Sequence, residues 1–96
     1  MMAGYYSEVN EVNEEIKILA NDMKEKVENI LGETLQIYKP IMFTNKIIDG
    51  TNYNIKIKVG DDNYMHLKIH VPLDIYNSPN ELLEYELNMN ISDPLN

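Results

Sequence analysis

The strongest constraint on the fold is a strict alternation of apolar and polar residues over two neighbouring segments, 53–59 and 65–71. Apolar side chains occupy the odd positions of both, namely Tyr53, Ile55, Ile57, Val59, Met65, Leu67, Ile69 and Val71. A period of two is typical of a strand with one buried and one solvated face. Residues 60–63, Gly-Asp-Asp-Asn, favour a tight turn between these two segments. The sequence therefore predicts a long antiparallel hairpin, and its apolar side needs a cover because an isolated hairpin is only marginally stable.

A helix of matching length is predicted upstream. Apolar residues recur there at three- and four-residue spacing, at Ile16, Leu19, Ala20, Met23, Val27, Ile30 and Leu31. Asn13 can cap the start of this helix, and Gly32 can end it. A helix of roughly 28 Å matches strands of roughly 30 Å. The predicted fold class is therefore α+β, with one long helix packed against a curved antiparallel sheet of four to five strands.

Two further segments are predicted to complete the sheet. Residues 35–47 carry an odd-numbered apolar face made of Leu35, Ile37, Ile41, Phe43 and Ile47. Pro40 cannot donate to a strand ladder, so it predicts a bulge. Residues 83–89 alternate again, with Leu83, Tyr85, Leu87 and Met89 apolar, and residues 91–96 are expected to form a loosely held tail. We expect one domain spanning residues 1–96.

Composition narrows the range of partners. The chain has 96 residues, no cysteine and a formal net charge of −8. Such a charge repels a phosphate backbone, so we expect no nucleic-acid partner. No stretch approaches the ~20 apolar residues of a membrane span, so we expect no membrane partner either. The sequence is typical of a soluble protein of a reducing compartment, and we expect a cytoplasmic location.

The sequence contains few residues arranged as a catalytic or metal-binding site would require. His66 and His70 fall on the predicted solvated face, and four residues along a strand place them ~13 Å apart, too far to share one metal ion. The serines lie in terminal or loop contexts, and without cysteine a nucleophile–base pair is hard to assemble. We therefore expect a binding protein without cofactor or metal, and not an enzyme.

One run of residues is more specific than these patterns. The segment Lys46-Ile47-Ile48-Asp49-Gly50 is followed by Thr-Asn-Tyr at 51–53 and by Tyr-Met-His-Leu-Lys at 64–68. It resembles the stefins, the small cystatin-type inhibitors of papain-like cysteine proteases, whose hairpin loop reads Gln-Val-Val-Ala-Gly before Thr-Asn-Tyr. The resemblance runs from about residue 15 to residue 87. Ile47, Ile48 and Gly50 match the loop, whereas Lys46 and Asp49 depart from it.

The resemblance implies a function and a site. Stefins block the active-site cleft of papain-like proteases reversibly and competitively, with a wedge made of an N-terminal segment around a glycine and two loops. Carried over to this chain, the protease-binding residues would be Ala3, Gly4, Lys46, Ile47, Ile48, Asp49, Gly50, Leu73 and Asp74. In stefins a Pro-Gly pair follows the leucine of the second loop, and here Asp74-Ile75 replaces it.

The departures leave two hypotheses open. The first is an inhibitor of papain, cathepsin L or cathepsin B-like proteases that is weaker or more selective than its relatives. The second is a non-inhibitory interaction module on the same scaffold, which the altered loop residues favour. The resemblance also implies a monomer that can exchange its helix and first strands with a second copy, by opening the turn at residues 47–50 into a domain-swapped dimer.

Overall fold

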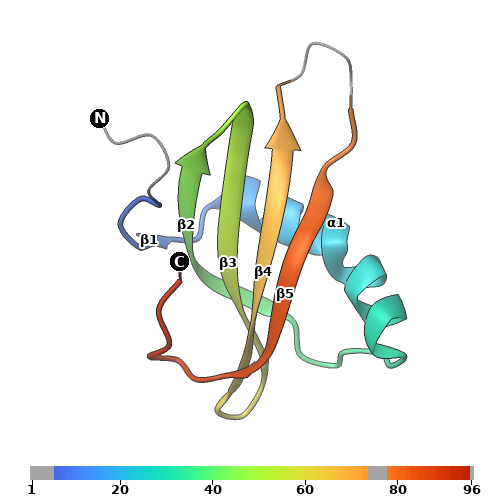
Figure 1. Cartoon of the computed structure of the whole chain (residues 1–96). Coiled ribbons are helices and arrows are strands. Elements are labelled where there is room, and N and C mark those ends of the chain that lie inside the picture. Colours follow the sequence, from blue (N-terminus) through green and yellow to red (C-terminus); the bar gives the residue numbers. More distant parts are fainter. Residues whose placement is uncertain (1–5, 74–77, 96) are drawn as a thin grey trace.

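The computed structural model describes residues 6–73 and 78–95. Within these ranges the chain forms β1 (Asn10–Glu11), α1 (Glu14–Leu31), β2 (Lys39–Ile47), β3 (Gly50–Gly60), β4 (Asn63–Pro72) and β5 (Glu81–Met89). All neighbouring strands are antiparallel, and their order in the sheet is their order in the chain. The helix crosses one face of the sheet (Figure 1). The predicted α+β class, a helix on an antiparallel sheet, is confirmed.

Both predicted ends of α1 are confirmed. The side chain of Asn13 accepts a hydrogen bond from the backbone N–H of Ile16 at 2.9 Å, which satisfies one of the free donors of the first turn. Gly32 ends the helix with φ 73° and donates its N–H to the Glu28 carbonyl at 2.8 Å. One apolar assignment was wrong: Ile30 is 47% exposed, whereas its neighbour Leu31 packs against the core.

The core lies between α1 and the long β3–β4 hairpin. Paired across the hairpin are Ile55 with Leu67, Ile57 with Met65, and Tyr53 with Ile69. From the helix side the core receives Ile16, Leu19, Ala20, Met23 and Val27, all buried. A fully buried side chain of this size contributes about 1.5–3 kcal/mol, so this interface dominates the stability of the fold. The predicted hairpin, including its turn at residues 60–63, is confirmed.

The strand before the turn is shorter than predicted. β2 begins at Lys39 rather than at residue 35, and the register shifts near Pro40, which confirms the predicted bulge. Leu35 is still buried, held by a hydrogen bond from its N–H to the Glu28 carboxylate at 2.8 Å. Ile37 and Ile47 are exposed, so the predicted apolar face of this segment was wrong at these two positions.

β5 forms an edge of the sheet, and its predicted alternation was also wrong. Two register shifts interrupt its pairing with β4. Leu82 rather than Leu83 pairs with Ile69 and packs against the core, and Leu83, Tyr85 and Leu87 are all at least 40% exposed at this edge. A bulge adds an unpaired residue and moves each following side chain to the other face, so a period of two cannot be maintained through it.

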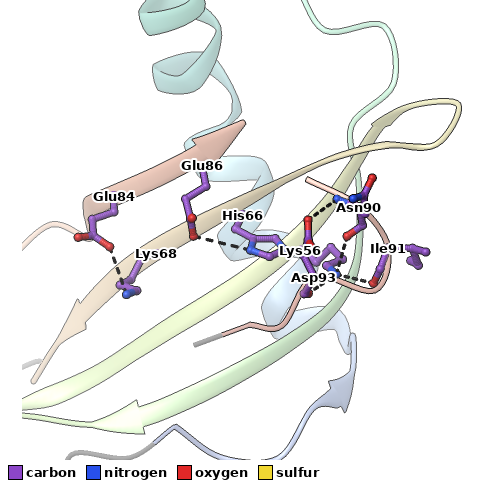
Figure 2. A network of polar contacts seen from close by, with 8 residues as sticks. All are labelled: Lys56, His66, Lys68, Glu84, Glu86, Asn90, Ile91 and Asp93. Carbon is purple, nitrogen blue, oxygen red and sulfur yellow. Dashed lines mark hydrogen bonds and ion pairs between the residues drawn. The ribbon is translucent and has the colours of Figure 1, made fainter. Parts of the chain in front are cut away.

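Part of the polar face of the sheet, predicted to be exposed to solvent, is covered by the C-terminal residues. Residues 90–95 fold back over it, and Leu95 is buried. Lys56 donates from Nζ to the backbone carbonyls of Asn90, Ile91 and Asp93 at 2.5–3.0 Å (Figure 2). Lys56 and His66 are 1% and 2% exposed. The predicted solvated position of His66 and the predicted loose tail were therefore wrong.

No helix in the described part of the chain is long and apolar enough to cross a membrane.

Candidate functional site

The turn between β2 and β3 projects two large apolar side chains into solvent. Ile47 is 67% exposed and Ile48 is 43% exposed. The turn itself is ordered by its backbone: the N–H of Ile48 donates to the Gly50 carbonyl at 3.1 Å, and Asp49 has φ 46°. Aspartate is one of the few residues other than glycine that visits this left-handed region readily. The turn is thus formed before any partner binds.

Gly50 is the point at which this turn meets the end of β4. It pairs with Pro72 and has φ 113°. A Cβ on residue 50 would lie 2.4 Å from the Val71 carbonyl oxygen and 3.1 Å from the Leu73 nitrogen. Both the backbone conformation and the space therefore require glycine. This close approach sets the β2–β3 turn directly beside the start of the following loop.

Leu73 begins that second loop. Its side chain is 54% exposed. Together with the two isoleucines of the turn, it makes an exposed apolar edge at one end of the sheet, which we call the apolar edge (Ile47, Ile48 and Leu73). Asp74 lies outside the described residues, so the predicted second residue of this loop is not placed.

Ser7, near the start of the described residues, lies at the same end of the sheet, beside β2. Ser7 donates its N–H to the Asn45 carbonyl at 2.7 Å, and its hydroxyl accepts from the Asn45 N–H at 3.0 Å. Ala3 and Gly4 lie outside the described residues. Two hydrogen bonds therefore hold Ser7 against β2. They join it to Asn45, which lies two residues before the end of that strand.

Lys46 does not extend freely from the turn. Its Nζ lies over the ring of Tyr6, 4.9 Å from the centroid, and the Nζ of Lys68 lies 5.4 Å from the same centroid. Lys46 was predicted as a site residue and Tyr6 was not, because nothing in the local sequence pattern links residue 6 to two strands far along the chain. The only available signal was a tyrosine next to the predicted N-terminal segment.

A second contact below the turn was also missed. Asn52 pairs with Lys46 on one side and with His70 on the other. The Oδ1 of Asn52 lies 2.5 Å from the Nδ1 of His70, a hydrogen bond that ties β3 to β4 just below the apolar edge. His70 is half-buried, and its predicted position as a surface residue was wrong in this respect.

Within residues 6–73 and 78–95, no three His, Cys, Asp or Glu side chains gather closely enough to hold a metal ion. What the described residues bring together at this end of the sheet is exposed apolar surface on a rigid backbone, with a cation and an acid at the rim. Such an arrangement can bind another protein, since a preformed apolar edge needs little ordering when it binds.

The comparisons with known proteins agree with this architecture. The profile of the cystatin domain matches residues 4–92, and the chain belongs to the cystatin family. Cystatin-A of Felis catus is 32% identical over 99% of this chain and 97% of its own length. Cystatin-B of Homo sapiens is 30% identical with the same coverage, and leukocyte cysteine proteinase inhibitor 1 of Sus scrofa is 30% identical over 99% of this chain and 92% of its own length.

Proposed function

We propose that this protein is a reversible, competitive inhibitor of papain-like cysteine proteases of the papain and cathepsin L or B type. Members of the cystatin family are protease inhibitors rather than enzymes, and one relative is named a cysteine proteinase inhibitor. In this proposal the segment around Ala3 and Gly4, the turn Lys46–Gly50 and the loop at Leu73 and Asp74 enter the active-site cleft together. The protein acts in the cytoplasm as a single cystatin domain.

The observation that carries the proposal is the apolar edge. Ile47, Ile48 and Leu73 are large, exposed and adjacent, on backbone held by the close packing of Gly50 against β4. Large exposed apolar residues gathered at one place on a small protein mark an interaction surface. Because the turn is already ordered, little conformational entropy is lost on binding, and more of the contact energy appears as affinity.

The two departures from the stefin loop, at residues 46 and 49, change the affinity and selectivity of this inhibitor. Asp49 places a carboxylate at the tip of the turn, and a carboxylate desolvated in a cleft without a partner is costly. The ammonium group of Lys46 is already engaged with Tyr6, so this cation enters the complex with part of its surroundings fixed. We therefore infer an inhibitor that is weaker or more selective than its relatives.

The test is steady-state inhibition of papain and of a cathepsin L-like protease at graded substrate concentrations. We expect the apparent inhibition constant to rise linearly with substrate, as for competitive binding. Ile47→Ser removes apolar surface that is 67% exposed, so the fold should survive. Its inhibition constant should rise at least about tenfold, because less apolar area is buried in the complex.

The matched control is Ile18→Ser, which removes the same side chain from an exposed position, 60% accessible, on α1. It should inhibit like the native protein. Equal weakening by both variants would contradict a site at the apolar edge. No inhibition by verified monomer at micromolar concentration would favour the second hypothesis, a non-inhibitory interaction module. The altered residues 46, 49 and 74 are the sequence feature that favours this hypothesis.

A further inference from the structure

A group of exposed apolar side chains lies outside the apolar edge, where α1 ends beside β5. Ile30 of α1 is 47% exposed, and Leu83, Tyr85 and Leu87 of β5 are 40–44% exposed. The C-terminal half of α1 lies next to β5, the outermost strand on that side of the sheet (Figure 1). Single exposed apolar residues are ordinary on a protein surface, whereas a group at one place marks an interaction surface.

These side chains line a concave surface. Ile30 and the middle of β5 enclose a hollow of about 510 Å³, which we call the β5 groove and which is lined by Ile30, Leu82, Leu83, Glu84, Tyr85 and Glu86. A second hollow, of about 480 Å³, also includes Ile30 and is otherwise lined by Asp22, Glu25, Lys26 and Asn29 of α1. Ile30 therefore stands between two concave surfaces, each with room for a side chain of a partner.

The charge around Ile30 is negative. The described residues that line the two hollows include one cation, Lys26, and the carboxylates of Asp22, Glu25, Glu84 and Glu86. The side chains of Glu84 and Glu86 are 66% and 63% exposed. Although Glu84 pairs with Lys68 at 3.2 Å, a carboxylate can accept further hydrogen bonds. This surface therefore attracts cations rather than anions.

Apolar and acidic side chains lie on opposite faces of β5. Tyr85 pairs with Leu67 on the face that α1 covers, whereas Glu84 pairs with Lys68 and Glu86 with His66 on the other face. Because β5 is an edge strand, a segment that lies along it can reach both faces at once. Its apolar side chains would meet the groove and its cations would meet the carboxylates.

Two other occupants fit less well. A second copy, paired antiparallel along β5, would bring Glu84 and Glu86 against the same residues, and each chain already carries a net charge of −8. Like charges placed directly opposite are destabilising. A continuous β ladder with another strand is also disfavoured, because two register shifts interrupt β5 and bulges at an edge obstruct strand pairing. The occupant must therefore bind mainly through its side chains.

We propose that the β5 groove is a docking site for a basic segment of another protein, in which large apolar side chains are flanked by lysines or arginines. An apolar side chain enters the groove beside Ile30 and Tyr85, and the flanking cations pair with Glu84 and Glu86. The site goes beyond the proposed inhibitory function, since its lining shares no residue with the apolar edge. A surface of this size gives weak, transient binding.

The first test titrates the protein into a short fluorescein-labelled peptide of alternating lysine and leucine, read by fluorescence anisotropy. We expect saturable binding with a Kd below about 1 mM. Binding should weaken severalfold between about 20 mM and about 300 mM sodium chloride, because salt screens exposed charges. Peptides with glutamate for lysine, or serine for leucine, should not bind. Absence of saturable binding by the lysine–leucine peptide would overturn the proposal.

Ile30→Ser tests the apolar part of the site. Its affinity for the peptide should fall about five- to thirtyfold, because apolar area that the complex would bury is lost. Ile18→Ser removes the same side chain from a 60% exposed position on the same helix and should bind like the native protein. Equal affinities of the two variants would contradict docking in the groove.

The acidic part is tested by the double variant Glu84→Gln with Glu86→Gln, which should bind several times more weakly and with less dependence on salt. Asp61→Asn with Asp62→Asn is the matched control, since it removes as much charge from the β3–β4 turn, where asparagine tolerates the φ of 52° at residue 62. Equal weakening by both double variants would mean that net charge alone attracts the peptide, and the groove would not be the site.

A last comparison keeps this site apart from the inhibitory one. Ile30→Ser should inhibit papain like the native protein, and Ile47→Ser should bind the peptide like the native protein. Loss of inhibition alone would therefore leave the docking site standing, and loss of peptide binding alone would leave the inhibitor standing. Native protein that dimerises on concentration by light scattering, while Ile30→Ser stays monomeric, would overturn the proposal in favour of a second copy in the groove.

Discussion

At the scale of single residues, the least expected one is His66. It is buried on the face that the sequence pattern predicts to be solvated, and neither ring nitrogen has a hydrogen-bond partner among the described residues. Burial lowers the pKa of this imidazole, and the ammonium group of Lys56 lowers it further, whereas the carboxylates of Glu86 and Asp93 oppose the shift. The Nδ1 of His66 lies 3.9 Å from the nearest Glu86 oxygen, too far for a hydrogen bond (Figure 2).

This residue predicts a loss of stability in mild acid. Because the pKa of His66 is lower in the folded protein than the usual value of about 6.5 in the unfolded chain, the unfolded chain binds the proton first. Stability is therefore full above about pH 6.5 and falls below it, by up to about 1.4 kcal/mol per pH unit, until the folded protein is protonated too. Urea unfolding between pH 7.5 and pH 5.5 measures the effect.

Two variants isolate the contribution of His66 to that loss. His66→Phe fills a similar volume without titrating, so its free energy of unfolding should depend less on pH over this interval. His70→Phe removes the other histidine and is the comparison for His66→Phe. If His66→Phe and the native protein lost equal stability on acidification, other groups would be responsible and this account of His66 would be wrong.

At the scale of elements, the tail is held by one side chain. Three backbone carbonyls between residues 90 and 93 converge on Nζ of Lys56, which uses the full donor capacity of an ammonium group. The tail also closes on itself, since Asp93 accepts from the Asn90 N–H through Oδ2 at 2.7 Å and donates its own N–H back to the Asn90 carbonyl at 3.1 Å. The tail is therefore a compact loop docked on β3.

Lys56→Met is expected to release this tail while leaving the sheet intact. Methionine has similar length but no donor, so the three carbonyls turn to solvent. Global stability should change by less than about 2 kcal/mol, because losing the hydrogen bonds is offset by no longer burying a charge. Hydrogen exchange at the amides of Asn90 and Asp93 should accelerate, while the β3–β4 amides stay protected.

Lys58→Met is the matched control for Lys56→Met. It removes a cation two residues further along the same strand and should leave tail exchange unchanged. Exchange in the tail that did not respond to Lys56→Met would mean that the buried Leu95, rather than the lysine, holds this segment in place.

At the scale of the whole molecule, the β2–β3 turn is also the place where the chain could open. Asp49 has φ 46°, in the left-handed region, where even aspartate is less stable than glycine, and an extended chain removes that cost. If the turn opens, α1, β1 and β2 of one copy can pair with β3 of another and keep every strand contact except the turn itself. The exchange is then limited by partial unfolding and by concentration.

We expect a concentrated sample, heated into its unfolding transition and cooled, to contain a dimer by light scattering. This dimer should not inhibit papain, because its turn at residues 47–50 is stretched and the apolar edge is lost. Asp49→Gly should form less dimer, since glycine takes the closed turn without strain. A refolded sample that remained entirely monomeric would rule out exchange under these conditions.

Much of the fold follows from the sequence by itself. The alternation over residues 53–71, the stripe on α1 and the caps at Asn13 and Gly32 are all local signals, and the structure confirms each of them. The exceptions are Ile30 of the stripe, which is exposed, and His66 of the alternation, which is buried on the polar side. The rest can be predicted because a side chain's face in a strand or helix depends on its position in a short period. Gly50 was also identifiable, although only the structure shows that the end of β4 leaves no room for a Cβ there.

The tertiary structure alone decided what covers each surface. Lys56 and His66 have the same alternation as solvated residues, yet they are buried by a segment whose contact with Lys56 begins 34 residues further along the chain. Tyr6 meets Lys68 only because β2, β3 and β4 lie side by side. Local periodicity predicts which face of a strand is apolar. It does not predict whether a distant segment of the chain will cover the polar face. That contact exists only once the whole chain has folded.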